Sequence, residues 1–386
     1  TMCAARKMNR KIKLTYIIDV LDTNLAGTEN QLIKMINGVD KGRFAVELIC
    51  FSDHPWLQAN KASLACSINI FSIARFKKPA TYLEFFKLVN YLRLSKPDAV
   101  HTFFPVGNIV GVLASKLAGV KVIISSRRDY GEWMSPRYLF FTKLANRFVT
   151  RIIANSNAVK ELTLEKEGLG EDRVGVIYNG IDPDFCRGLV RDSGLKKRLN
   201  IPEGNLVVGI VANFRPMKHH HTFIMAAAEV PKTRKDITFL LIGTGKLKAE
   251  MEKLADELNI KDNMLFVGAQ REVLPYLSIM DLGVNCSEGE GLSNAVMEYM
   301  SAGIPCVVSR AGGNPDLIQD GVNGCTFDID DHKTLASAML SLFADAAVRA
   351  RFTAEARRKI EREMSLGVIL SRYESLYSGL VKERAR

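Results

Sequence analysis

The sequence contains no apolar run long enough to cross a membrane. The longest candidate, Ile109–Ile124, is interrupted by Lys116 and Lys121, whereas a spanning helix needs about 20 predominantly apolar residues. The N-terminus is basic, but the apolar segment that follows it contains Asp19 and continues as a strand, which is not typical of a cleaved signal. These absences predict a globular protein of the cytoplasm.

Cysteine pairs are also missing. The chain has 7 cysteines, an odd number, and no Cys-x-x-Cys motif. Cys50, Cys286 and Cys306 lie in or beside apolar, strand-like runs. This position favours buried, reduced thiols over a disulfide framework.

The chain lacks Pro- or Ser-rich linkers, low-complexity tracts and short-period repeats. No Gly-x-Gly-x-x-Gly turn follows its first expected strand, which argues against a dinucleotide-binding oxidoreductase. At 386 residues the chain exceeds what one hydrophobic core usually serves, so two domains are expected.

Acidic residues are scarce in the first half of the chain. Residues 1–185 hold 26 Lys and Arg against 17 Asp and Glu, a net charge of +9, whereas residues 186–386 hold 27 against 25, a net charge of +2. A basic half can attract an anionic surface, or it can simply be evenly solvated. We predict no nucleic-acid partner.

Short apolar strands alternate with amphipathic helical segments along the whole chain. In residues 1–185 the expected strands are Lys13–Asp22, Ala45–Phe51, Ile68–Ile73, Ala99–Phe103, Lys121–Ser125, Arg151–Ala154 and Val174–Tyr178. In residues 186–364 they are Leu206–Ala212, Ile237–Ile242, Met264–Val267, Leu282–Cys286, Pro305–Ser309 and Gly324–Phe327. This alternation predicts an α/β protein with two Rossmann-like, doubly wound parallel sheets, whose ligands bind at the carboxyl ends of the strands.

Residues 286–308 carry the most informative pattern. Ser293 is a good N-cap and Gly303 a good left-handed C-terminal residue, so a helix is expected over residues 294–302. Its N-terminus, after a loop that contains Gly291, suits an anion such as phosphate.

Two acids, Glu290 and Glu298, frame this expected anion site. Carboxylates would repel a diphosphate alone, but a nucleotide sugar also carries hydroxyls that need acceptors. The alternative is that the glycine and serine only shape a turn and that the acids are solvated.

The pattern Glu-Gly-Leu-Ser-Asn-Ala, followed by Glu298 and by Ala-Gly-Ile-Pro-Cys-Val-Val, resembles the donor-site signature of the retaining glycosyltransferases of family 4, the glycosyl transferases group 1. The resemblance covers nearly the whole chain and implies the GT-B fold, in which two Rossmann-like domains face a cleft. Residues 1–185 would be the acceptor-side domain and residues 186–364 the donor domain, with a last helix in residues 365–386 that crosses back onto the first domain.

The resemblance also implies roles for the acids and the loop. Glu290 would contact the donor sugar and Glu298 the ribose hydroxyls, while Gly291, Leu292 and Ser293 would face the phosphates and the sugar. Gly27, in the loop after the first strand, matches a family position that faces the donor phosphates.

A basic loop follows the strand Leu206–Ala212. Lys218 matches the lysine of the family, whereas Asn213 stands where an arginine is usual, and Arg215 is expected to replace that arginine. Two cations here can offset charge on a departing diphosphate, although in isolation such residues are more often solvated.

Two residues of the first half are candidates for the acceptor side. His101 ends a strand and either orients a substrate or is a hydrogen-bonded core histidine. Arg128 takes a position where the family frequently has a histidine near the reacting sugar. Arginine cannot act as a base, but it supplies a fixed charge or a bidentate contact.

Three consecutive histidines, His219, His220 and His221, invite a metal interpretation. Consecutive residues at a helix start were expected to point in different directions, so no metal site is predicted there. The stretch Tyr130–Arg151 is aromatic and basic; it either lies on an anionic membrane or packs into the core.

Together these observations predict a retaining glycosyltransferase that moves a sugar from a UDP- or GDP-linked donor to a glycan or lipid-linked acceptor in bacterial-type glycolipid or polysaccharide assembly. No metal or other cofactor is expected. Peripheral contact with the inner face of the membrane is expected. Two alternatives stay open, namely a nucleotide-sugar epimerase of the same architecture and a non-catalytic nucleotide-sugar-binding protein.

Overall fold

The structure, a computed structural model, describes residues 10–23, 27–73, 79–131 and 134–385. Contacts divide the chain into two compact units, Thr1–Gly180 with Leu366–Arg386 and Ile181–Ser365. The second unit begins at Ile181 and not at residue 186, because the Ile181 N–H donates to the Met364 carbonyl at 3.0 Å and Ile181 pairs with Ser365 in an isolated β-bridge.

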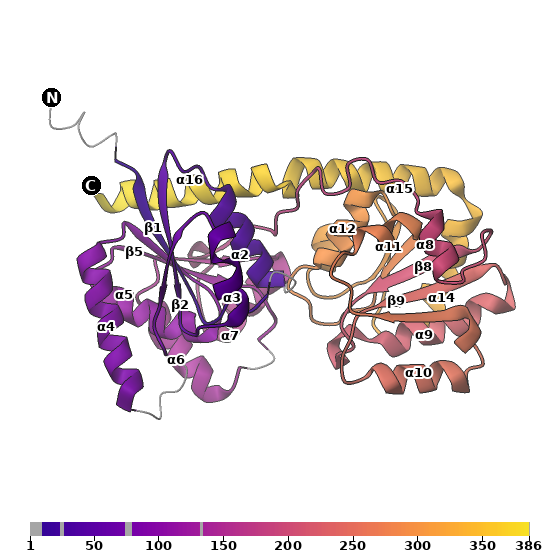
Figure 1. Cartoon of the computed structure of the whole chain (residues 1–386), viewed down its shortest axis with the longest axis horizontal. Coiled ribbons are helices and arrows are strands. Elements are labelled where there is room, and N and C mark those ends of the chain that lie inside the picture. Colours follow the sequence, from indigo (N-terminus) through magenta and orange to yellow (C-terminus); the bar gives the residue numbers. More distant parts are fainter. Residues whose placement is uncertain (1–9, 24–26, 74–78, 132–133, 386) are drawn as a thin grey trace. The chain divides into compact units, whose positions relative to one another are not determined.

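The first unit is built on a parallel sheet of seven strands in the order β3-β2-β1-β4-β5-β6-β7 (Figure 1). Its strands are β1 (Ile12–Ile18), β2 (Phe44–Cys50), β3 (Ser67–Ile70), β4 (Ala99–Thr102), β5 (Val122–Arg127), β6 (Arg151–Ala154) and β7 (Val174–Val176). Each overlaps with a strand expected from the sequence. The central strands β4 and β5 are buried along their whole length, as expected for strands covered on both faces of a parallel sheet.

Helices cover both faces of this sheet (Figure 1). One core cluster joins the strands to α2 (Gly27–Gly38), α3 (Pro55–Asn60) and α16 (Leu366–Ala385). The other joins them to α4 (Pro79–Ser95), the π-helix η3 (Gly107–Gly111), α5 (Val112–Leu117), α6 (Pro136–Asn146) and α7 (Asn157–Glu167).

The last helix packs onto the first unit, as expected. α16 buries Ile369, Tyr373, Tyr377 and Leu380, which recur at helical spacing on one face. They join the core that contains Tyr16 of β1.

The second unit is a parallel sheet of six strands in the order β10-β9-β8-β11-β12-β13. Its strands are β8 (Leu206–Val211), β9 (Ile237–Ile242), β10 (Met264–Gly268), β11 (Leu282–Asn285), β12 (Cys306–Ser309) and β13 (Cys325–Phe327). Its helices are α8 (Ser193–Arg198), α9 (His220–Glu229), α10 (Lys248–Glu257), α11 (Leu274–Ile279), α12 (Asn294–Ala302), α13 (Asn314–Leu317), α14 (His332–Ala344) and α15 (Ala346–Lys359).

Among the described residues, every helix is too short or too polar to cross a bilayer. The cysteines in those residues are free thiols, and Cys50, Cys286 and Cys306 are buried as expected. Cys3 lies outside the described residues.

Candidate functional site

The expected helix after the glycine loop is confirmed as α12. Ser293 caps it, since its hydroxyl accepts a hydrogen bond from the Val296 N–H at 3.4 Å, and Gly303 ends it with φ of 71°. The loop before the helix is buried at Gly291, Leu292 and Ser293. The free N–H groups and the positive end of the α12 dipole therefore lie at the end of a buried loop.

Lys218 and Glu290 are paired in the second unit. The Lys218 Nζ lies 2.9 Å from Oε2 of Glu290, and the two side chains are 14% and 23% exposed. Burial disfavours the charged form of Glu290, but the Lys218 ammonium together with hydrogen bonds from Asn285 and Ser287 outweighs that effect and holds the pKa of the carboxyl below its ordinary value. Glu290 is thus a carboxylate that accepts hydrogen bonds and does not donate them.

Asn285, the last residue of β11, organises the loop and was not singled out from the sequence. Its Nδ2 donates to the Ser293 hydroxyl at 3.1 Å, and its Oδ1 accepts from the Ser287 N–H and from Nδ2 of Asn314, both at 3.0 Å. Asn285 is 2% exposed. The available signal was a polar residue that ends an apolar strand directly before a glycine loop.

Two further glycines permit the fold of this loop. A Cβ on Gly312 would lie 2.5 Å from the Glu290 carbonyl oxygen, and one on Gly313 would lie 2.1 Å from that of Gly291. The Gly313 N–H donates to the Glu290 carbonyl at 2.9 Å. Any side chain at either glycine would displace the loop that holds Glu290.

Two polar side chains of the predicted basic loop, Asn213 and Arg215, make few contacts within the protein. Asn213 is exposed, and its Oδ1 accepts a long hydrogen bond from the Thr244 N–H at 3.4 Å. Gly243 lies so close to the start of this loop that a Cβ added to it would be 2.0 Å from the Ala212 carbonyl oxygen. Arg215 is exposed, and no ion pair or hydrogen bond of its guanidinium occurs within the part of the chain that the structure describes. Its charge is available to a ligand.

The second unit therefore gathers most of the predicted donor residues on the loops after β8 and β11. Glu298 lies partly buried on α12. Gly27, by contrast, belongs to the first unit, where it is the exposed first residue of α2.

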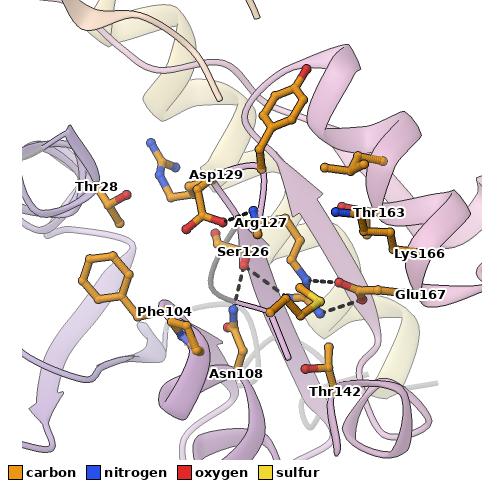
Figure 2. A pocket seen from close by; sticks show the side chains of 16 residues that line it. Thr28, Phe104, Asn108, Ser126, Arg127, Asp129, Thr142, Thr163, Lys166 and Glu167 are labelled. Atoms are coloured by element: carbon orange, nitrogen blue, oxygen red, sulfur yellow. Dashed lines mark hydrogen bonds and ion pairs between the residues drawn. The ribbon is translucent and has the colours of Figure 1, made fainter. Parts of the chain in front are cut away.

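A small pocket in the first unit lies at the carboxyl ends of β4 and β5 (Figure 2). Its lining includes Thr28, Phe104, Asn108, Ser126, Arg127, Arg128, Asp129 and Glu167. Arg128 thus lines this pocket together with Thr28, whereas Gly27, the residue before Thr28, does not belong to the lining. The Nη2 of Arg128 donates to Oδ1 of Asn179, whereas its buried Nε has no hydrogen-bond partner among the described residues.

His101 is a core residue in this structure. It is fully buried; Nδ1 lies 2.8 Å from the Tyr377 hydroxyl and Nε2 lies 2.9 Å from the Ser126 hydroxyl. Burial, helped by the nearby Arg128 charge, lowers the pKa of His101 to about 3, so the ring is neutral. Of the two interpretations of His101, the geometry favours the hydrogen-bonded core histidine over direct contact with a substrate.

The lining of the same pocket also contains a buried ion pair, of Arg127 and Glu167. Figure 2 shows the guanidinium of Arg127 against the carboxylate of Glu167, with Nε–Oε1 at 2.7 Å and Nη2–Oε2 at 2.9 Å. Asn146 bonds both partners, at 3.0 and 2.6 Å. A buried, fully bonded pair of this kind fixes the strand end that carries Arg128.

The expectation that the three histidines diverge is wrong for two of them. One ring nitrogen each of His219 and His221 and a carboxylate oxygen of Asp330 lie within 4.8 Å of one another. They meet because His219 adopts a left-handed conformation, with φ of 45°, at the start of α9. His220 instead turns inward, is 3% exposed and stacks on Phe214.

The aromatic, basic stretch 130–151 is only partly used for packing. α6 buries Thr142, Ala145 and Asn146, but Phe140 and Phe141 are 64% and 46% exposed. Its exposed basic residues are Arg137, Lys143 and Arg147. Residues 132–133 lie outside the described residues. Core packing therefore accounts for one side of α6 and leaves an aromatic, basic side to solvent.

Comparison with known families gives matches over both halves of the chain. Residues 25–185 match glycosyltransferase family 4, and residues 193–359 match glycosyl transferases group 1. The chain is 23% identical, over 97% of its length and 99% of the relative, to UDP-Gal:alpha-D-GlcNAc-diphosphoundecaprenol alpha-1,3-galactosyltransferase of Escherichia coli. It is 29% identical to N-acetyl-alpha-D-glucosaminyl L-malate synthase of Bacillus anthracis, over 54% of this chain and 55% of that relative.

Solved structures show the same fold. Anabaena HepE in complex with UDP superposes with a TM-score of 0.83 at 21% identity, covering 95% of this chain and 100% of that one. A glycosyltransferase of Rickettsia africae superposes with a TM-score of 0.85 at 16% identity, covering 97% and 99%. Since both halves match one group of enzymes and the whole chain has their GT-B fold, the chain belongs to the family 4 glycosyltransferases, the glycosyl transferases group 1.

Proposed function

We propose that the enzyme transfers a sugar from a UDP- or GDP-linked donor to a hydroxyl of a glycan or lipid-linked acceptor, with retention of configuration. The observation that carries this proposal is the Lys218–Glu290 pair beside the capped N-terminus of α12. A cation and a helix N-terminus suit a diphosphate, and a carboxylate held ionised suits sugar hydroxyls. The name of the E. coli relative, a galactosyl transfer from UDP-Gal to a diphosphoundecaprenol-linked sugar, supports this class of donor and acceptor.

Each residue of the second unit has a distinct part in the proposed reaction. Glu290 orients the donor sugar and Glu298 accepts hydrogen bonds from the ribose hydroxyls. Gly291, Leu292 and Ser293 present backbone N–H groups to the phosphates. Lys218 and the exposed Arg215 face the diphosphate, with Asn213 at the edge of that site.

The transfer step follows from these contacts. The bond between the anomeric carbon and the diphosphate oxygen breaks, and the acceptor oxygen bonds to the same face of that carbon. The acceptor proton passes to the departing diphosphate, whose growing negative charge is stabilised by Lys218, Arg215 and the α12 N-terminus. We propose that these groups make a metal ion unnecessary for the transfer.

In the first unit, we propose that Gly27 contacts the donor phosphates and that Arg128 acts on the acceptor side. Arg128 contributes a fixed positive charge, because an arginine side chain does not serve as a general base. His101 contributes indirectly, through its hydrogen bonds to the hydroxyls of Ser126 and Tyr377.

We further propose that the enzyme works in the cytoplasm, at the inner face of the membrane, where a lipid-linked acceptor is met. The aromatic, basic side of α6 and the net charge of +9 in residues 1–185 support contact with anionic lipid.

Ligand-induced stabilisation followed by product analysis tests the proposal. A ligand present at 100 times its dissociation constant stabilises the folded state by about 2.7 kcal/mol, so a thermal-shift panel of nucleoside diphosphates and their sugars identifies the donor base. Proton NMR of the product anomeric centre then reports retention or inversion. Conversion of the donor with no acceptor present would indicate an epimerase, and tight binding with no turnover would indicate a binding protein.

A further inference from the structure

Two segments of the second unit, the start of α9 and the connection between β13 and α14, bring imidazole and carboxylate groups to one point. Nδ1 of His219 and Nε2 of His221 lie 2.9 Å and 2.8 Å from the same oxygen, Oδ1 of Asp330. The Thr222 hydroxyl donates to that oxygen at 2.9 Å. His219 follows the loop after β8, and Asp330 lies in the connection between β13 and α14.

The second nitrogen of His219 is also occupied. Its Nε2 lies 3.0 Å from Oε2 of Glu288, in the loop after β11. A neutral imidazole has one N–H, so it can donate to Glu288 or to Asp330 but not to both. When Nε2–H donates to Glu288, the lone pair of Nδ1 points at the position shared with His221 and Asp330. Histidines that bind metals commonly donate their other N–H to a carboxylate in this way.

We propose that His219, His221 and Asp330 form a binding site for a divalent transition-metal ion such as Zn²⁺, with Glu288 orienting His219. Two imidazoles and one carboxylate suit Zn²⁺, Co²⁺ or Ni²⁺ better than Mg²⁺ or Ca²⁺, which prefer oxygen ligands. The three ligand atoms lie within 4.8 Å of one another. Tetrahedral ligands about 2.0–2.2 Å from one ion are about 3.3–3.6 Å apart, so binding requires Asp330 to withdraw from both nitrogens and the two imidazoles to settle at that spacing.

The surroundings leave room for this adjustment and for a fourth ligand. The Asp330 and His221 side chains are 57% and 43% exposed, so a water can complete a tetrahedral site. The His219 side chain is 14% exposed, so it has the least freedom to move among the three ligands.

The site is separate from the proposed chemistry but connected to it along the chain. His219 directly follows Lys218, and Glu288 lies in the same loop as Glu290. The Glu288 N–H already donates to the Met217 carbonyl at 2.9 Å. A bound ion would therefore restrain the two loops that carry the Lys218–Glu290 pair, without touching the sugar.

Metal titration of protein that carries no polyhistidine tag tests the site. After treatment with a chelator, Zn²⁺ binding is measured by calorimetry and Co²⁺ binding by visible absorption. His221→Ala and Asp330→Asn each remove one ligand; Asn tolerates the positive φ of 63° at residue 330, so the second variant is expected to fold. His332→Ala, a nearby histidine outside the set, is the matched control.

The parent and His332→Ala are expected to bind one ion per chain, and both ligand variants are expected to bind at least about tenfold more weakly. Hydrogen exchange in residues 215–222 and 286–290 is expected to slow with Zn²⁺ in the parent and in His332→Ala, but not in the two ligand variants. Equal affinity in the parent and in His221→Ala would overturn the proposal. A thiolate-to-cobalt charge-transfer band would overturn it as well, because it would place the ion on a cysteine.

Discussion

Glu167, the last residue of α7, is ion-paired with Arg127, the last residue of β5, through two hydrogen bonds of 2.7 and 2.9 Å. The two side chains are 2% and 9% exposed, so both charges are removed from water. Such a pair need not be more stable than an apolar pair, but breaking it leaves one buried charge uncompensated. Its evident structural effect is to fix the end of β5, next to Arg128.

We therefore expect Glu167→Gln to lower the free energy of unfolding by about 3–5 kcal/mol, as is typical when one partner of a buried pair is removed. Urea denaturation measures it. Glu171→Gln, which removes a carboxylate that is 84% exposed and pairs with Lys160 at 3.6 Å, is the control and should have little effect. Equal effects in the two variants would show that the Arg127 charge is not buried in solution.

A second prediction concerns Asp19, which accepts hydrogen bonds from the N–H groups of Val106 and Gly107. Burial raises the pKa of Asp19 from 3.8 to about 6, although these bonds oppose the shift. A raised pKa favours the protonated folded state, so its contribution to stability is complete below about pH 4 and is lost as pH rises through about 6.

The variant Asp19→Asn has no charge to titrate. Hence the stability of the parent relative to Asp19→Asn should fall between pH 4 and pH 7, by on the order of 2 kcal/mol. Chemical denaturation at several pH values measures this difference. Asp53→Asn, at an exposed position, is the control. A difference that is independent of pH would mean that Asp19 is solvated in the folded protein.

The sequence predicted the strands and α12 well, because their signals are local. An apolar run identifies a strand buried on both faces, and Ser293 and Gly303 mark the two ends of α12. α15 has a much weaker sequence signal, because only Phe352 and Ala356 are buried in it, which leaves almost no helical periodicity.

The site was less predictable where it depends on residues that are distant along the chain. Arg127 and Glu167 are 40 positions apart, and nothing in the sequence links them. Likewise, the left-handed backbone at His219 cannot be read from three identical histidines. Such features arise from tertiary packing and not from local preference.

Arg128 is expected to act through the geometry of its guanidinium. Arg128→Lys keeps the charge but loses the planar fork, one arm of which bonds Asn179, so turnover should fall about tenfold or more. Initial rates at saturating donor measure this, with Arg147→Lys on the exposed side of α6 as control. If Arg128→Ala retained parental turnover, Arg128 would have no part in the transfer.

The proposed membrane contact predicts binding to anionic vesicles that weakens with salt. Replacing both Phe140 and Phe141 with Ser should reduce co-sedimentation, because it removes exposed aromatic surface while leaving the buried side of α6 unchanged. Val190→Ser, at an exposed apolar residue of the second unit, is the control. Equal recovery with neutral and anionic vesicles at all salt concentrations would exclude the electrostatic contact.

Glu298 and Lys218 should differ in which kinetic constant they control. A carboxylate that accepts hydrogen bonds from the ribose hydroxyls has the same hydrogen bonds in the ground state and in the transition state. Glu298→Ala is therefore expected to raise KM and to weaken nucleoside diphosphate binding, with a smaller effect on kcat. Glu250→Ala, on exposed α10, is its control.

Lys218 is expected to act mainly on the transition state, because the negative charge on the diphosphate grows as the glycosidic bond breaks. Removing a group that stabilises developing charge typically lowers kcat by about 10²–10³. Lys218→Ala also leaves Glu290 without the cation that lies 2.9 Å from it in the parent. The pKa of Glu290 should therefore rise, because burial of the carboxylate is then less well opposed. Initial-rate kinetics on both variants, together with calorimetric titration of the nucleotide, separate the two effects. If Glu298→Ala bound every nucleotide as tightly as the parent, the ribose assignment would be wrong, and the proposed roles of the whole Glu290–Glu298 segment would fail with it.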